Sequence, residues 1–223
     1  MINTKYFIFN AFQENCIVVW DEEGNCAIVD PGFCGDDEGS IVADFIASKG
    51  LKPICVMLTH GHFDHIYGVK RMAERYGIPV YMSSKEKVIL EKANGMICGA
   101  YGMPLPDISF DWKNIEEGDV IEVGSLRFEV IATPGHTPGG VCYLERNEKV
   151  MLSGDTLFAG CIGRTDNQWG DYDALISGIL DKLMALDGDI RVLPGHGPQT
   201  TVADERMKNP FLQPFNEPWD EEE

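Results

Sequence analysis

The residues best suited to chemistry lie in one short stretch, LTHGHFDHIYG, which holds His60, His62, Asp64 and His65. A β-strand sends alternate side chains to the same side, so His60 and His62 at the end of a strand can point toward one place. Asp64 and His65, where a helix would begin, can point toward a neighbouring place. Burying such groups without partners would cost roughly 2 kcal/mol or more for each. Because imidazole and carboxylate are ligands of Zn²⁺, Fe²⁺ and Mn²⁺, this spacing predicts a site for one metal ion or a pair.

Further ligands are expected in turns that follow other strands. The chain has only five histidines, and the two outside this stretch are His136 in TPGHTPGG and His196 in LPGHGP. Asp155 lies in a comparable position in SGDTLF. Each of the three follows an apolar run typical of a strand, and side chains at strand ends can converge on one edge of a sheet. We therefore expect His136, Asp155 and His196 to complete the site.

Apolar periodicity predicts the elements that must position these side chains. The order of strands and helices suits an α/β fold in which two β-sheets pack face to face with helices on both outer sides. Residues 92–106 show no clear periodicity and predict a loop, which either covers the site or closes the core. Helices are expected over 38–50, 66–77, 171–186 and 201–208, and strands over 5–9, 15–20, 26–30, 53–58, 78–82, 107–112, 120–123, 125–132, 141–146, 149–154 and 190–194.

The composition is that of a globular protein with one domain, since 44% of the 223 residues are hydrophobic and 24% are charged. We expect this domain to span residues 1–216, and residues 217–223 to form a solvated acidic tail. The net charge of −18 argues against nucleic acid and against membranes as partners, because their phosphates require a basic surface.

The compartment is predicted from apolar runs and cysteine usage. No apolar run approaches the roughly 18 residues of a membrane span, and MINTKYFIFN lacks the basic start and long apolar stretch of a secretory signal. The cysteines are scattered without a C-x-x-C pair, which predicts buried free thiols for most of them. We therefore expect a cytoplasmic protein. The seven cysteines are Cys16, Cys26, Cys34, Cys55, Cys98, Cys142 and Cys161.

These motifs resemble those of the metallo-β-lactamase fold superfamily, and its short, single-domain glyoxalase-II-like hydrolases (hydroxyacylglutathione hydrolase-like) match best. The resemblance covers nearly the whole chain, from AIVDPG through THGHFDH and GDTLFAGCIGRTD to PGHGPQTT and ERMKNPFL. It implies the four-layer αββα sandwich of that family, in agreement with the order of elements above. It also implies a first metal held by His60, His62 and His136, a second held by Asp64, His65 and His196, and Asp155 as the bridge between them.

The resemblance implies two divalent ions, Zn²⁺ ahead of Fe²⁺ or Mn²⁺, and a hydrolytic reaction. Two ions about 3.5 to 4 Å apart share a water and lower its pKa toward neutrality, so a metal-bridging hydroxide would be the nucleophile, with Asp64 and Asp155 as catalytic residues. The ions would also stabilise the oxyanion and accept a departing thiolate. The implied partner is a small-molecule thioester such as S-lactoylglutathione, hydrolysed by a monomer or small homo-oligomer.

Three features leave roles open. The full-length enzymes carry a carboxy-terminal helical domain that contacts glutathione, whereas this chain ends 27 residues after His196, so the carrier of the acyl group stays open. Arg164 and Asp166 in GRTD form either a buried ion pair that shapes the site or a substrate contact. Asp30 in IVDPG matches a family position and either orients a ligand histidine or caps the turn before Pro31.

Two other readings remain. Persulfide dioxygenases share the fold and the GRTD motif, and they use one Fe²⁺, whose ligands here would be His60, His136 and Asp155. A non-catalytic metal-binding domain is the second reading. The seven candidate ligands argue against it, because a structural zinc site needs only four. Hydrolysis of β-lactams or lactones and nuclease activity are also within the chemistry of two metals.

Overall fold

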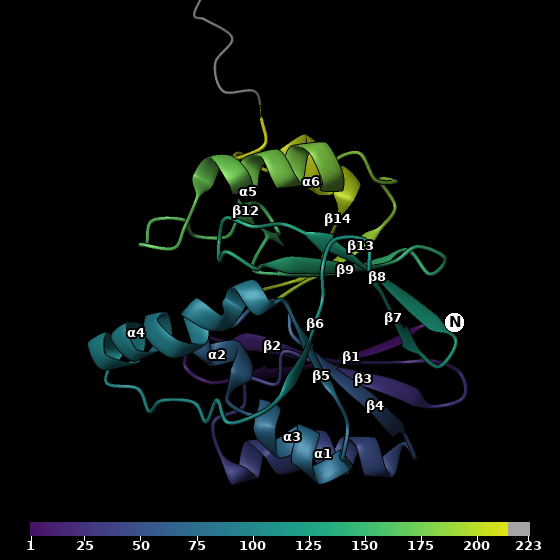
Figure 1. The fold of residues 1–223 in the computed structure, drawn as a ribbon. Helices are drawn as coiled ribbons and strands as arrows, with labels where there is room; N and C mark the ends of the chain where they lie inside the picture. The colour runs from purple at the N-terminus through teal and green to yellow at the C-terminus, as the bar shows by residue number, and fades with distance from the viewer. Residues whose placement is uncertain (214–223) are drawn as a thin grey trace, which may run out of the picture.

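The computed structural model describes residues 1–213 and contains two six-stranded β-sheets that pack face to face (Figure 1). Helices α5 (Tyr172–Gly178) and α6 (Val202–Lys208) lie over one sheet at the top of Figure 1, and α1 (Asp36–Ser48) and α3 (Val69–Tyr76) lie under the other. The predicted four-layer αββα sandwich of the α/β class is therefore confirmed. The predicted acidic tail and residues 214–216 of the predicted domain lie outside the described residues.

The first sheet follows the order of the chain. It consists of β1 (Asn3–Phe9), β2 (Glu14–Trp20), β3 (Asn25–Val29), β4 (Lys52–Met57), β5 (Val80–Met82) and β6 (Trp112–Asn114). β1, β2 and β3 pair antiparallel, as the predicted meander requires, and β4, β5 and β6 continue in parallel with β3. The segment that follows β4 therefore leaves the sheet at its carboxyl edge, where sites in such sheets lie.

The second sheet has the order β14-β13-β10-β9-β8-β7. It consists of β7 (Val120–Val123), β8 (Leu126–Ala132), β9 (Val141–Glu145), β10 (Val150–Gly154), β13 (Arg191–Pro194) and β14 (Thr200–Thr201). A short antiparallel pair, β11 (Leu157–Phe158) and β12 (Cys161–Ile162), follows β10. β10 and β13 are neighbours and run parallel, so the turns that follow them lie side by side.

Three apolar clusters hold the four layers together. Met57 and Phe128, one from each sheet, are fully buried between the two sheets. Met72 of α3 packs in the cluster on the outer face of the first sheet, and Leu175 of α5 packs in the cluster on the outer face of the second. Burial of this kind stabilises the fold by roughly 25 cal/mol per Å² of apolar surface, and it fixes the strand ends on which the site depends.

Helix ends agree with the glycine signals, but three predicted segments differ. Gly77 is left-handed and caps α3, and Gly50 is left-handed two residues after the end of α1. The helix predicted over 66–77 is divided into α2 (Phe63–Ile66) and α3, and Gly68 between them packs so closely on the Phe33 ring that a Cβ there would clash. The strand predicted over 107–112 was wrong for most of its length, since only Trp112 enters β6. Asp107 instead caps a turn by accepting a hydrogen bond from the Ser109 amide at 2.9 Å.

The loop predicted over residues 92–106 was also wrong for residues 92–101. The chain forms a turn of 3₁₀-helix, η1 (Ser84–Glu86), then a π-helical turn, η2 (Ile89–Ala93), and then α4 (Asn94–Tyr101). In Figure 1, α4 projects at one end of the sandwich. This helical segment lies beside the candidate site.

All seven cysteines are free thiols, and five of them are buried, as the sequence predicted. Within residues 1–213, no helix combines the length and the apolar character that are needed to cross a bilayer.

Candidate metal centre

The seven predicted ligands come together from four loops at the carboxyl ends of strands. His60, His62, Asp64 and His65 follow β4, with the last two already in α2. The other three follow strands of the second sheet: His136 after β8, Asp155 after β10 and His196 after β13.

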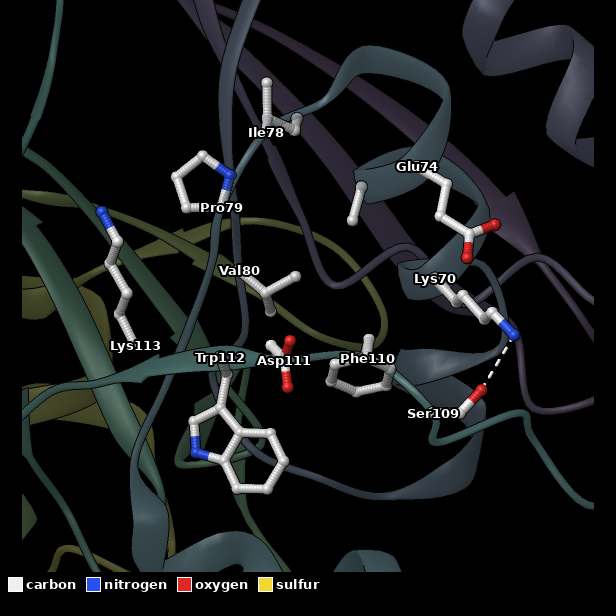
Figure 2. Close-up of a pocket in the computed structure, with 11 residues that line it drawn as sticks. Lys70, Glu74, Ile78, Pro79, Val80, Ser109, Phe110, Asp111, Trp112 and Lys113 are labelled. Carbon is white, nitrogen blue, oxygen red and sulfur yellow. Dashed lines mark hydrogen bonds between the residues drawn. The ribbon is translucent and has the colours of Figure 1, made fainter.

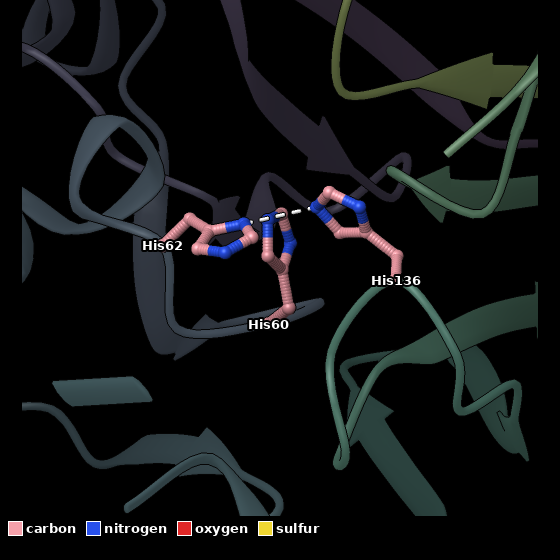
Figure 3. A group of neighbouring side chains, drawn as sticks. All are labelled: His60, His62 and His136. Atoms are coloured by element: carbon pink, nitrogen blue, oxygen red, sulfur yellow. Dashed lines mark hydrogen bonds between the residues drawn. The ribbon is translucent and has the colours of Figure 1, made fainter. Parts of the chain in front are cut away.

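The first cluster consists of His60, His62 and His136, whose ligand atoms lie within 4.8 Å of one another. Nδ1 of His62 and Nε2 of His136 are 2.9 Å apart. Figure 3 shows the three rings gathered around one place, with His60 between the other two in this view. These are the three residues that the sequence assigned to the first metal.

The second cluster consists of Asp64, His65 and His196. Nε2 of His65 lies 3.2 Å from Nε2 of His196, and Nε2 of His196 lies 3.4 Å from Oδ2 of Asp64. These are the residues that the sequence assigned to the second metal.

Asp155 lies between the two clusters. Its carboxylate oxygens are 3.5 Å from Nε2 of His136 and 4.0 Å from Nε2 of His60 in the first cluster. They are 3.5 Å from Nε2 of both His65 and His196 in the second. One carboxylate therefore has the position of a bridge between two ions.

The donor set fits metal ions. Nε2 of His60 and Oδ1 of Asp155 are buried and have no hydrogen-bond partner, which is costly unless another group contacts them. Ligand atoms about 2.0 to 2.1 Å from a tetrahedral Zn²⁺ lie roughly 3.4 Å apart. The 3.2 to 3.5 Å separations around Asp64, Asp155 and His196 match that spacing. The residues present therefore fit divalent metal ions.

Four of the five histidines use Nδ1 for a hydrogen bond and direct Nε2 toward the centre of the candidate metal site. His136 donates to the carbonyl oxygen of Arg164 at 2.8 Å, and His196 donates to that of Phe12 at 2.9 Å. Since a carbonyl oxygen only accepts, each ring carries its proton on Nδ1, and its Nε2 lone pair is available to a metal.

The other two of these histidines depend on Asp30. His65 Nδ1 lies 3.2 Å from Oδ2 of Asp30, and His60 Nδ1 lies 3.0 Å from the Thr59 hydroxyl, which itself donates to Asp30 at 2.6 Å. Asp30 also accepts from the Thr59 amide at 2.8 Å. Of the two roles predicted for Asp30, the contacts place it as the residue that orients ligand histidines.

Burial sets the protonation of the first cluster. It lowers the pKa of His60, His62 and His136, so the neutral form that binds metals is favoured. For Asp64, burial alone would raise the pKa, but His65 and other nearby histidines hold it below the usual range. Asp64 is therefore ionised at neutral pH.

Two glycines next to the ligands allow the strand ends to approach this closely. A Cβ at Gly195 would lie 2.7 Å from Cε1 of His65. Gly154 has a left-handed φ of 48°, and a Cβ there would clash with the Thr59 side chain. Larger residues at either position would displace the ligands.

A pocket of about 410 Å³ opens onto both clusters. The Phe12 ring packs edge to face against Phe63, with centroids 5.1 Å apart, and against Tyr101, with centroids 5.7 Å apart. This aromatic wall was not predicted, because single aromatic residues in unrelated segments carry no pattern. The pocket is lined by Phe12, His62, Phe63, Asp64, Ile97, Tyr101, His136, Asp155, Phe158, Arg164, Asn167 and His196.

Arg164 and Asp166 form the predicted ion pair, but the pair is not buried. Nε of Arg164 lies 3.0 Å from Oδ1 of Asp166, and the side chains are 74% and 70% exposed. Because Arg164 also lines the pocket, its cation lies at the entrance.

A second pocket, of about 430 Å³, lies away from the clusters, between α3, β5 and residues 109–113 (Figure 2). Phe110 and Trp112 line it, and at its rim Lys70 donates to Ser109 at 2.8 Å. None of the seven candidate ligands lines this pocket.

Comparison with known proteins decides the family. The family model described as the metallo-beta-lactamase superfamily matches residues 9–196, a range that contains all seven candidate ligands. The chain belongs to the metallo-β-lactamase superfamily. One relative in this superfamily is a Haemophilus influenzae protein named hydroxyacylglutathione hydrolase GloC. It is 37% identical over 216 residues, which are 95% of this chain and 98% of the relative.

Solved structures of the superfamily have the same fold. The BLEG-1 B3 metallo-β-lactamase superposes with a TM-score of 0.86 at 35% identity and covers 95% of this chain and 100% of its own. TTHA1623, in a di-iron-bound form, gives 0.82 at 35% identity and covers 93% and 100%. ETHE1 from Myxococcus xanthus gives 0.75 at 26% identity and covers 93% and 83%.

Proposed function

We propose that this superfamily member is a metal-dependent hydrolase of small-molecule thioesters, with S-acylglutathiones such as S-lactoylglutathione as the first candidates. The observation that carries the proposal is that two triads of ligands share Asp155 at the floor of one pocket. The 37% identity to a protein named hydroxyacylglutathione hydrolase supports the thioester as substrate. It also supports assigning metal binding to all seven predicted residues.

The chain's own groups prepare the site for hydrolysis. When bound, the two ions lower the pKa of a shared water toward neutrality and polarise the substrate carbonyl. Asp64, which stays ionised, is placed to accept a hydrogen bond from the attacking water, and Asp155 holds the two ligand sets in register. The wall of Phe12, Phe63 and Tyr101 excludes bulk water and packs against the acyl group.

The entrance of the pocket suits an anionic carrier. Within residues 1–213, the carboxylate that pairs with Arg164 is the exposed Asp166, and such surface pairs are worth about 0 to 1 kcal/mol. A carboxylate of the substrate can therefore replace Asp166 at small cost, which supports the substrate-contact role for Arg164.

Metal identity, partners and compartment belong to the same proposal. We assign Zn²⁺ because it suits histidine ligands and a departing thiolate; Fe²⁺ is the alternative, given the di-iron form of TTHA1623. We expect a monomer or small homo-oligomer with no nucleic acid or membrane partner. The free cysteines support the cytoplasm as its compartment.

The likeness to ETHE1 from Myxococcus xanthus keeps the mononuclear Fe²⁺ persulfide dioxygenase as a second candidate. His60, His136 and Asp155 are close enough to one another for such a triad. The complete second cluster of Asp64, His65 and His196 favours the hydrolase, because a single ion would leave those three groups without a function.

The test is metal content together with turnover. Protein prepared in parallel with Zn²⁺ and with Fe²⁺ would be assayed for thiol release from a panel of thioesters and for oxygen uptake on glutathione persulfide. We expect about two ions per chain and thioester hydrolysis that disappears with a chelator and returns with the metal. One iron per chain with oxygen uptake would establish the dioxygenase. A β-lactam would be assayed as well. Metal binding without turnover of any thioester, of glutathione persulfide or of the β-lactam would favour the non-catalytic domain.

A further inference from the structure

One buried carboxylate connects the two loops that carry the first cluster. Glu86, at the end of η1, has an exposed fraction of 0%. Its Oε2 accepts a hydrogen bond from the Gly61 amide at 2.7 Å, and its Oε1 accepts one from the Gly139 amide at 2.6 Å. Each oxygen of a single side chain therefore holds a different loop.

The two amides lie in the loops that carry all three ligands of the first cluster. Gly61 lies between His60 and His62, and Gly139 lies three residues after His136 in the same turn. The first loop leaves β4 of one sheet, and the second connects β8 to β9 of the other. Glu86 therefore links the two sheets at the place where the first cluster draws ligands from both.

Asn94 of α4 holds the same loop from its other backbone group. Its Nδ2 donates to the Gly61 carbonyl oxygen at 2.9 Å, and the residue is 1% exposed. Both backbone polar groups of Gly61 are thus bound by side chains of the helical segment that begins with η1 and ends with α4.

The fit is close at both glycines. A Cβ at Gly61 would lie 3.1 Å from Oε2 of Glu86, and a Cβ at Gly139 would lie 2.9 Å from Oε1. Burial raises the pKa of Glu86 to about 7, and the Thr137 side chain together with the two amides opposes that shift by stabilising the carboxylate. The carboxylate thus has defined partners on both oxygens, as a group that fixes a distance must have.

We propose that Glu86 is a positioning residue that sets the spacing between His136 and the His60–His62 pair and so tunes metal affinity at the first cluster. The proposal rests on the metal-binding part of the proposed function and not on the identity of the substrate. Groups that orient metal ligands typically change metal affinity by about 10- to 100-fold when removed, and Glu86 acts on three ligands through two amides.

The test is the Glu86→Gln variant, which keeps the side-chain volume and one acceptor oxygen but turns an NH₂ group toward one of the amides. Zn²⁺ affinity would be measured by competition with a chromophoric chelator, and ligand geometry by the visible absorption of Co²⁺. We expect one of two Zn²⁺ equivalents to weaken by about 10- to 100-fold, the other to stay unchanged, and the Co²⁺ bands of the weakened site to shift. The matched control is Glu145→Gln. Glu145 is 2% exposed and accepts from the Glu148 amide at the other end of β9.

A second comparison separates positioning from a general loss of stability. In a His136→Ala background the first cluster is already broken, so adding Glu86→Gln should leave the affinity of the remaining ion unchanged. If Glu86→Gln does not fold, Asn94→Ala should produce a smaller shift confined to the same Zn²⁺ equivalent. The proposal fails if both equivalents weaken together, or if both affinities and the Co²⁺ spectrum match those of Glu145→Gln. A change in Zn²⁺ affinity without any thioester hydrolysis would sustain this role and refute the substrate assignment.

Discussion

His65 contacts Asp30 through Nδ1 and Oδ2 at 3.2 Å, and the same Oδ2 accepts the Thr59 hydroxyl that holds His60. A single carboxylate oxygen therefore orients one histidine of each cluster. Glu86 holds the backbone beside the three ligands of the first cluster, whereas Asp30 contacts groups of both clusters. The two residues should consequently have different effects when they are changed.

Asp30→Asn should weaken both metal equivalents by about 10- to 100-fold. An amide keeps only one acceptor oxygen. Its NH₂ group would face either the Thr59 hydroxyl and His65 at the Oδ2 position or the Thr59 amide at the Oδ1 position, and either placement breaks contacts of the loop that carries His60 and His65. Asp30 has a φ of 45°, a conformation that Asn also tolerates, so backbone strain does not confound the result. Chelator competition measures the affinities. Weakening confined to one equivalent would contradict a shared role.

Asp155→Ala should abolish turnover and lower metal content together, because the carboxylate that lies within reach of both clusters is lost. We expect activity to fall by at least about 100-fold, measured beside the metal-to-protein ratio. Asp166→Ala is the control, since it removes an exposed carboxylate at the entrance of the same pocket. Near-normal activity in Asp155→Ala would rule out the bridging position.

Tyr101→Ala should raise KM for a thioester roughly tenfold, equivalent to about 1.4 kcal/mol, and leave metal content unchanged. The Tyr101 ring forms part of the aromatic wall that lines the pocket. Within residues 1–213 its ring contact is with Phe12, and it makes no ring contact with a ligand histidine. Met96→Ala is the control, since Met96 is exposed on the same helix and does not line the pocket. Equal kinetic constants in the two variants would show that Tyr101 of α4 does not contribute to substrate binding.

Asp21→Asn should destabilise the metal-free protein at neutral pH by about 1 to 2 kcal/mol, an effect that fades in acid. Burial opposes ionisation of Asp21, but hydrogen bonds from Asn25, Ser125 and Glu23 outweigh it and lower the pKa to about 2. Since the folded pKa is lowered, the stabilisation is complete above the unfolded pKa of about 3.9. It is lost as pH falls through about 2. Urea unfolding of both proteins from pH 7 to pH 2 measures the difference, and a constant difference would contradict the assignment.

Much of this fold follows from short-range patterns. β2 and β3 are mostly apolar runs buried on both faces, the second half of β4 is buried in the same way, and Gly77 ends its helix as expected. The ligand residues could be predicted for a similar reason. Four of them lie close together in the sequence, and the others follow apolar strands. What brings His136 and His196 to His60 is the face-to-face packing of the two sheets, which is a property of the topology.

The segment from η1 to α4 could not be predicted in the same way. Gly95, Gly99 and Gly102 disfavour a helix. In addition, the helical spacing of apolar residues begins before residue 92, at Ile89, and continues at Ala93 and Ile97, so it is missed when the segment is considered from residue 92. Packing of that stripe outweighs the local preference. Glu86 and Asn94 are single polar residues in this segment, and only their contacts with Gly61 distinguish them from surface residues.

Both clusters join parts of the chain that are distant in sequence, His62 to His136 over 74 residues and His65 to His196 over 131. Fastening such distant points restricts the unfolded chain, as a disulfide does in secreted proteins. Every cysteine here is a free thiol, so bound metal ions would supply the cross-links that disulfides supply in secreted proteins. Depletion of metal would then increase proteolysis of the protein as well as abolish its catalysis. The reason is that proteases cleave a chain more readily when its two halves separate more often.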